Sequence, residues 1–133
     1  MLAAGVLSFA DAAFRRDRRK TLAYSKVVHI EWAEEDATYI ATRSHRYPGA
    51  LDIGVDWTRE VLVDRQTLAI VPYPRSRMGA SAFVGWSPSA GRVLLVLAYQ
   101  DLDGNLHGLN AWPASGRDLS TYNEWTGHVE DDR

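Results

Sequence analysis

The sequence predicts an α+β fold, in which two helices precede a four-stranded antiparallel sheet and one helix follows it. Apolar residues recur at helical spacing in the segment before Thr67, whereas from Thr67 to Trp112 the period becomes that of β-strands. The connections between these strands are short and rich in turn-forming residues, which favours an antiparallel meander. Helices that precede a run of strands are typical of the α+β class.

The segment before Thr67 predicts one short strand and two helices. Residues 27–30 form a β-like run, and from Glu31 the pattern becomes helical, with acidic residues near the start where the helix dipole favours them. The turn-forming residues 47–49 end this first helix. Asp56 is placed to cap a second helix, which carries apolar residues on one face and ends near Asp64.

Four strands follow, at residues 67–71, 80–86, 92–99 and 106–112. The third is the most apolar and shows no polar alternation, so we expect it at the centre of the sheet, buried on both faces. Pro113 ends the last strand, and Ser115 or Asp118 is expected to cap a final helix that runs through Trp125. All five tryptophans fall at positions expected to face a core.

Composition indicates one domain in a reducing compartment. The 133 residues are 46% hydrophobic, which suffices for a core, and the absence of cysteine excludes disulfides and thiolate metal sites. The longest apolar run, Val93 to Tyr99, is far shorter than the roughly 18 residues of a membrane span. Near the N-terminus the basic residues follow the apolar ones, which reverses the order of a secretory signal. We therefore expect a cytoplasmic protein that is not bound to a membrane.

The charge is distributed unevenly along the chain. Residues 1–26 hold six Lys or Arg and two Asp, a net charge of +4, whereas residues 27–133 hold nine basic and fifteen acidic residues, a net charge of −6. This break predicts a flexible basic arm at 1–26, an α+β domain at 27–126 and an acidic tail at 127–133. An acidic body binds nucleic acid poorly, but residues 59–92 carry a net charge of +3 and leave room for one basic patch.

The spacing of candidate ligands argues against metal or cofactor chemistry. Asp101, Asp103 and Asn105 begin like a calcium loop, but that loop needs Gly at its sixth place and Glu at its twelfth, where this chain has Leu106 and Trp112. The four histidines show no i, i+4 pairing on a helix, and no glycine-rich phosphate loop is present. The sequence therefore indicates no metal and no cofactor.

The second half of the chain carries a series of motifs that resembles a known family. They are Phe83-Val84-Gly85-Trp86-Ser87, Gly91-Arg92 with the apolar run to Tyr99, Asp103-Gly104, and the stretch from Leu109 to Ser115. This arrangement resembles the BrnT branch of the RelE-like toxins, in which a strand ending in Gly precedes a Gly-Arg-apolar strand, a turn and a last apolar strand before a helix. The similarity spans about residues 28 to 122, with an insertion near residues 47 to 55.

The resemblance implies a RelE-like fold, metal-independent RNA cleavage, and neutralisation by a co-encoded antitoxin, here expected to be a ribbon-helix-helix protein. Such cleavage requires a base for the 2'-hydroxyl, cations for the phosphorane charge and an acid for the leaving oxygen. Arg92 matches the family's arginine in the central strand, and a histidine at 107 could move a proton. The catalytic candidates are therefore His107, Arg92 and Arg77, and the RNA-binding candidates are Arg75 and Tyr122.

The chain also departs from the family pattern. In that family the last strand closes in Ser-Ala-Arg-x-Ala-Thr. Trp112 stands where this motif has Arg, and Asn110 stands where it has Ser. On the first helix Tyr39, Arg43 and Ser44 stand where members often have His, His and Gly. The loss of an arginine that could hold phosphate supports a second hypothesis, a catalytically degenerate domain of the same fold that binds a protein partner. Acidic charge and Trp112 favour this alternative, whereas Arg92 and the basic stretch at 59–92 favour the enzyme.

Overall fold

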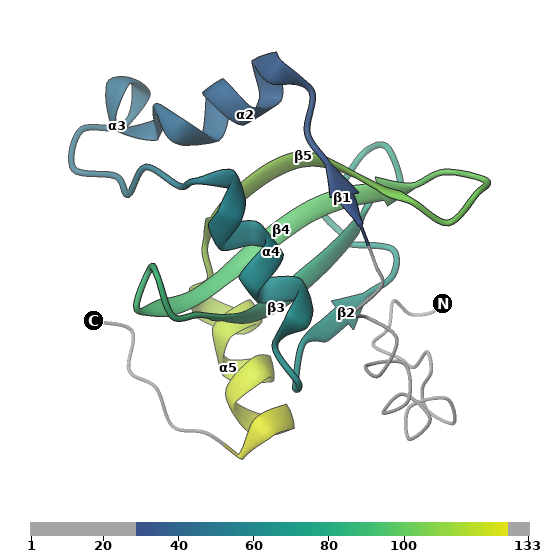
Figure 1. Ribbon diagram of the computed structural model, residues 1–133. Helices are drawn as coiled ribbons and strands as arrows, with labels where there is room; N and C mark the ends of the chain where they lie inside the picture. The colour runs from purple at the N-terminus through teal and green to yellow at the C-terminus, as the bar shows by residue number, and fades with distance from the viewer. Residues whose placement is uncertain (1–28, 128–133) are drawn as a thin grey trace.

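The computed structural model describes residues 29–127, which form a five-stranded sheet with helices on both faces (Figure 1). The expected basic arm, the start of the first strand and all but the first residue of the expected acidic tail lie outside the described residues. The elements in chain order are β1 (Ile30–Glu31), α2 (Glu34–Ala41), α3 (Arg43–Arg46), α4 (Val55–Val63), β2 (Leu68–Ile70), β3 (Ser81–Ser87), β4 (Arg92–Gln100), β5 (Leu106–Pro113) and α5 (Gly116–Thr126).

The sheet has the strand order β1-β5-β4-β3-β2. The expected antiparallel meander of β2 to β5 is confirmed. The expectation of a four-stranded, purely antiparallel sheet is wrong, because β1 adds a fifth strand that runs parallel to β5. Ile30 pairs with Leu106 and Glu31 with His107, and the Leu106 amide donates to the carbonyl oxygen of His29. The α+β class itself is confirmed.

The first helix differs from the expectation at both ends. It begins at Glu34 instead of Glu31, because Glu31 belongs to β1. It is also interrupted at Thr42, whose backbone leaves the helical region and whose hydroxyl donates to the carbonyl oxygen of Thr38 at 2.8 Å. The result is two short helices, α2 and α3, so that within residues 29–127 three helices instead of two precede β2. A threonine that bonds back onto the preceding turn is known to perturb a helix.

The expected helix caps are replaced by other interactions. Helix α4 begins at Val55 after Gly54, and Asp56 lies inside its first turn, where its carboxylate pairs with Arg59 at 3.0 Å. Ser115 does precede α5, but its side chain makes no capping hydrogen bond. These helices are therefore held chiefly by the packing of their apolar faces, as is usual for short helices.

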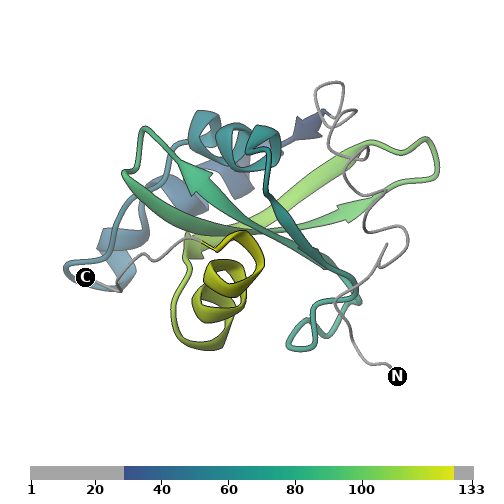
Figure 2. The same ribbon diagram turned by 90° about the horizontal axis from the view of Figure 1, so that it is seen from below.

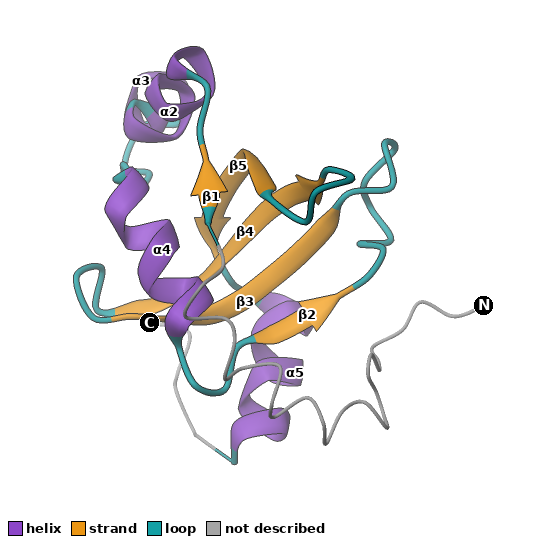
Figure 3. Cartoon of the chain, turned by 45° about the vertical axis from the view of Figure 1, so that its right-hand side comes forward, coloured by secondary structure: helices purple, strands orange, loops and turns teal. Residues whose placement is uncertain are grey.

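Strand β4 is the middle strand of the sheet, as expected from its apolar sequence. Its side chains alternate between two cores. Leu94 and Val96 contact the core beneath α2 and α4, whereas Val93 and Leu95 contact the core beneath α5. Figures 2 and 3 show α4 and α5 on opposite faces of the sheet. All four of these strand residues are fully buried or nearly so.

The five tryptophans do not all face a core. Trp32, Trp57 and Trp112 pack against the two clusters of buried residues, as expected. Trp86 and Trp125 are 36% and 40% exposed, so the expectation is wrong for these two. Among the described residues, no helix is long and apolar enough to cross a membrane.

Candidate functional site

The structure does not bring Arg92 and His107 together. Arg92 begins β4 and pairs with Ser87, whereas His107 pairs with Tyr99 near the other end of β4. Tyr99 follows Arg92 by seven residues, which corresponds to roughly 23 Å along the strand at a rise of about 3.3 Å per residue. One phosphate cannot contact both side chains, so these two catalytic candidates do not share a site.

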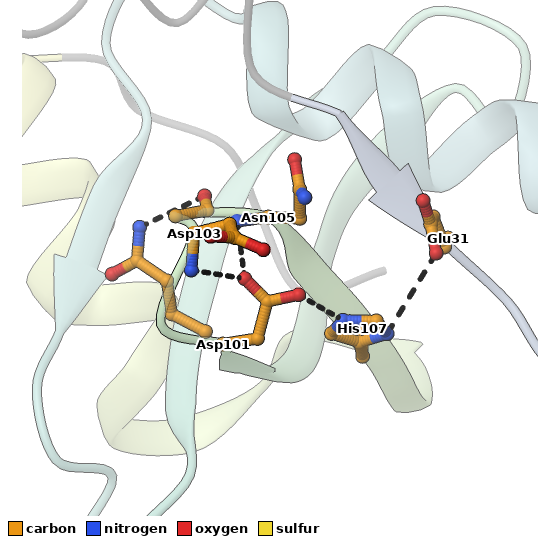
Figure 4. Close-up of polar contacts among 7 residues, drawn as sticks. Glu31, Asp101, Asp103, Asn105 and His107 are labelled. Atoms are coloured by element: carbon orange, nitrogen blue, oxygen red, sulfur yellow. Dashed lines mark hydrogen bonds and ion pairs between the residues drawn. The ribbon is translucent and has the colours of Figure 1, made fainter.

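His107 lies between two carboxylates (Figure 4). Its Nε2 lies 2.8 Å from Asp101 Oδ2, its Nδ1 lies 3.9 Å from Glu31 Oε1, and its ring stacks on that of Tyr99 with centroids 4.8 Å apart. The hydrogen bond from His107, assisted by the backbone amides of the same turn, lowers the pKa of Asp101. This geometry fixes the turn between β4 and β5 against β1. Within residues 29–127, no three His, Asp or Glu side chains gather as they would around a metal ion.

Arg75 and Arg77 are exposed in the loop that joins β2 to β3. The guanidinium carbon of Arg75 lies 5.8 Å from the ring centre of Tyr73, whose hydroxyl donates to Asp118 at 2.7 Å. Burial, and then the bond to Asp118, raises the pKa of Tyr73. This loop therefore offers two cations at the surface, next to an aromatic ring that is fixed to α5.

Tyr122, the other RNA-binding candidate, lies in the core. It is only 3% exposed, and its hydroxyl donates to Asp64 Oδ2 at 2.6 Å. The same carboxylate oxygen accepts the backbone amide of Trp86 at 2.8 Å. Tyr122 therefore helps to join α5 to the end of α4 and to β3.

A different set of residues forms a pocket of about 220 Å³ between the first helices and β5. We call it the arginine–tyrosine pocket, and it is lined by Tyr39, Arg43, Arg46, Tyr47, Asn110 and Trp112. Tyr39 lies on α2, Arg43 and Arg46 lie on α3, and Tyr47 directly follows α3. The last two project from the same face of β5, because they are two residues apart.

The two arginines of the pocket are held by tyrosine rings and by backbone carbonyls. The guanidinium carbon of Arg46 lies 3.6 Å from the ring centre of Tyr39 and 5.7 Å from that of Tyr47. Arg46 Nη2 donates to the carbonyl oxygen of Tyr39 at 2.8 Å, and Arg43 Nη1 donates to that of Leu51 at 3.0 Å. Because neutral groups hold them, both guanidinium groups keep their charge available to a ligand.

The pocket presents donors rather than acceptors. Nε of Arg46 is buried and makes no hydrogen bond to any residue that the structure describes. Asn110 Oδ1 accepts the Ala111 amide at 2.8 Å, which leaves the Nδ2 donors for a ligand. None of the six lining residues is acidic. Asp52, which is close enough to Arg43 for the two charges to interact, binds Ser44, and the Ser44 backbone amide lowers its pKa. This arrangement suits an anion.

Sequence reasoning missed Arg46 and Tyr47. It noted Tyr39, Arg43, Asn110 and Trp112 as single departures from a family pattern, without placing them together. The spacing of Tyr39, Arg43 and Arg46 was a usable signal, because residues four and three apart lie on one face of a helix. The side chains come close to β5 only through tertiary packing, which the spacing does not reveal.

The fold and the pocket together define an α+β domain with a cationic, aromatic pocket beside its sheet. Comparison with known proteins gives no matching family model, no matching curated protein and no matching solved structure.

Proposed function

We propose that this protein is the toxin-like member of a toxin and antitoxin pair, and that it cleaves RNA without a metal ion at the arginine–tyrosine pocket. The observation that carries the proposal is the meeting of Arg43 and Arg46 with three aromatic side chains in one small pocket free of carboxylates. Arginines bind phosphate, and aromatic rings stack on the bases of single-stranded RNA.

The departures from the BrnT-like pattern support this location. Tyr39, Arg43, Asn110 and Trp112 are four such positions, and all four line the pocket. Where that pattern places a cation on the last strand, this chain has Trp112, but it has Arg43 on the facing helix, where the pattern often has His. The positive charge has been moved across the pocket, so Trp112 does not by itself remove the capacity to hold phosphate.

The pocket offers groups for each requirement of the reaction. Attack of the 2'-hydroxyl on phosphorus needs cations for the charge of the phosphorane, which Arg43 and Arg46 would supply. Protons must leave the 2'-hydroxyl and reach the departing 5'-oxygen, and tyrosine hydroxyls can serve in such transfers. Tyr39 and Tyr47 are 41% and 55% exposed at the pocket, where an RNA strand could reach them. His107 lies outside the pocket lining and is engaged by Asp101.

The alternative is a domain of the same fold that has lost catalysis and binds a protein partner such as the antitoxin. Two observations favour it: His107 has carboxylates at both ring nitrogens, and Arg92 lies in a different part of the sheet. The two functions predict different behaviour of the wild-type protein in cells.

The deciding experiment is induced expression in bacteria, with growth and RNA integrity as readouts. We expect wild type to arrest growth and cleave RNA, and Arg46→Gln to slow cleavage by roughly a hundredfold, because one phosphorane cation is lost. Arg65→Gln is the matched control, since Arg65 is exposed and does not line the pocket. His107→Ala and Arg92→Ala test the first candidates in the same assay, with circular dichroism to confirm folding. Intact RNA and normal growth with wild type would leave the protein-binding alternative.

A further inference from the structure

We infer that the arginine–tyrosine pocket binds a nucleoside monophosphate, either as a free mononucleotide or as the phosphorylated end of an RNA strand. The inference rests on the proposed function, because it names the ligand of the same pocket. It is carried by the size, the charge and the aromatic walls of the pocket.

The pocket is small, and its volume suits a phosphate and part of one nucleotide. Pockets for drug-sized ligands typically occupy about 300–1,000 Å³, and this one occupies about 220 Å³. It lies between two short helices on one side and β5 on the other, so its walls are fixed by separate elements. An RNA duplex cannot enter such a space, whereas a single unstacked nucleotide can place its phosphate and one face of its base there.

The charge of the pocket suits a terminal phosphate as well as the phosphorane of the proposed reaction, because both carry more negative charge than an internal phosphodiester. A phosphomonoester carries a charge of about −1.5 to −2 at neutral pH, whereas an internal phosphodiester carries a single negative charge. Two guanidinium groups with no carboxylate in the pocket lining match the larger charge.

The aromatic walls favour a nucleotide over inorganic phosphate. The ring of Tyr47 has its centre 5.9 Å from the guanidinium carbon of Arg43 and 5.7 Å from that of Arg46, so a base attached to a bound phosphate lies within reach of this ring. Tyr47 is 55% exposed, which leaves ring surface for stacking. Trp112 provides a second aromatic side chain at the opposite wall.

The test is isothermal titration calorimetry of the full chain with adenosine 5'-monophosphate, adenosine and inorganic phosphate. We expect the monophosphate to bind at least tenfold more tightly than either of the other two, because only it engages both the arginines and the rings. Arg46→Gln and Tyr47→Ala should each weaken binding about tenfold or more, whereas Arg65→Gln should bind like wild type. The exposed Tyr47 provides a variant that does not depend on removing the backbone hydrogen bond of Arg46.

Two short single-stranded RNAs that differ only in a 5'-phosphate distinguish the source of the ligand. Tighter binding of the phosphorylated strand assigns the pocket to RNA ends, and binding of the free monophosphate alone assigns it to a mononucleotide; both outcomes support the inference. Equal binding of adenosine and its monophosphate, or unchanged binding in Arg46→Gln, would overturn it. If the protein binds the nucleotide but does not arrest growth, the proposed function is contradicted and this inference stands. If the protein cleaves RNA but binds no monophosphate, this inference is contradicted and the proposed function stands.

Discussion

At the scale of single residues, the turn between β4 and β5 depends on one carboxylate. Asp101 accepts hydrogen bonds from the His107 ring at 2.8 Å and from the backbone amides of Asp103 and Asn105, both at 2.9 Å. The pKa of Asp101 is lowered, first by the bond from His107. A carboxyl group whose pKa is lower in the folded protein stabilises it above the unfolded value, near 3.8, and loses that effect as the pH falls through the folded value.

Asp101→Asn should therefore lower the free energy of unfolding at pH 7, and the difference from wild type should shrink as the pH falls below about 4. Urea denaturation at several pH values measures both quantities. Asp103→Asn is the matched control, since within the described residues the Asp103 carboxylate accepts no hydrogen bond. Parallel pH profiles for wild type and Asp101→Asn would show that the charge of Asp101 contributes nothing to folding.

Four of the six residues that line the candidate site stand out in the sequence, but their grouping does not. Arg43 and Trp112 are conspicuous in the sequence because they differ from a pattern, yet they are 69 residues apart and meet only when the first helices pack beside β5. The stacking of Arg46 on Tyr39 depends on the break at Thr42, which sets how α3 follows α2. Such geometry is decided by non-local packing, and sequence spacing does not contain it.

At the scale of elements, the sequence correctly predicted the strands and helices whose side chains follow a regular pattern of burial. The apolar run of β4 indicated a central strand, since only a strand covered on both faces needs apolar residues without alternation. Strand β1 was not predicted as part of the sheet, because a two-residue strand owes its existence to pairing with residues 106 and 107. The end of the first helix was missed for a local reason, the hydroxyl of Thr42 bonding to the preceding turn.

The packing of the N-terminal segment on β5 makes a prediction at Gly108. A Cβ atom at this position would lie 2.2 Å from Cε2 of the Trp32 ring, far inside contact distance. Gly108→Ala should displace Trp32, whose Nε1 donates to Thr58 Oγ1 at 3.1 Å, and should cost about 1–3 kcal/mol of stability. Thermal denaturation measures the loss. Gly54→Ala is the control, since its Cβ would meet Trp57 at an ordinary 3.7 Å, and equal midpoints for the two variants would contradict the close approach of Trp32 to β5.

At the scale of the whole molecule, stability comes from two cores that share one sheet. The core beneath α2 and α4 and the core beneath α5 are both built on alternate residues of β4, so a change in this strand affects the packing of helices on either face. The pocket beside β5 depends on the first of these cores, because Ile40 of α2 is fully buried there and fixes the helix that carries Tyr39. The geometry of the pocket therefore depends on the packing of this core.

Leu95→Asp tests whether both cores depend on β4. Leu95 is fully buried in the core beneath α5, and the buried polar residues of the described chain, Thr58 and Ser87, are neutral, so no buried cation can pair with a new carboxylate. An unpaired buried charge costs several kcal/mol, which is a large fraction of the roughly 5–15 kcal/mol that stabilises a typical domain. We expect Leu95→Asp to show no cooperative unfolding transition by circular dichroism. Leu102→Asp introduces the same charge at a fully exposed position in the turn after β4 and should keep the wild-type midpoint. If Leu95→Asp instead unfolds cooperatively at a midpoint close to that of Leu102→Asp, the core beneath α5 does not depend on the packing of Leu95. Strand β4 would then not support both cores.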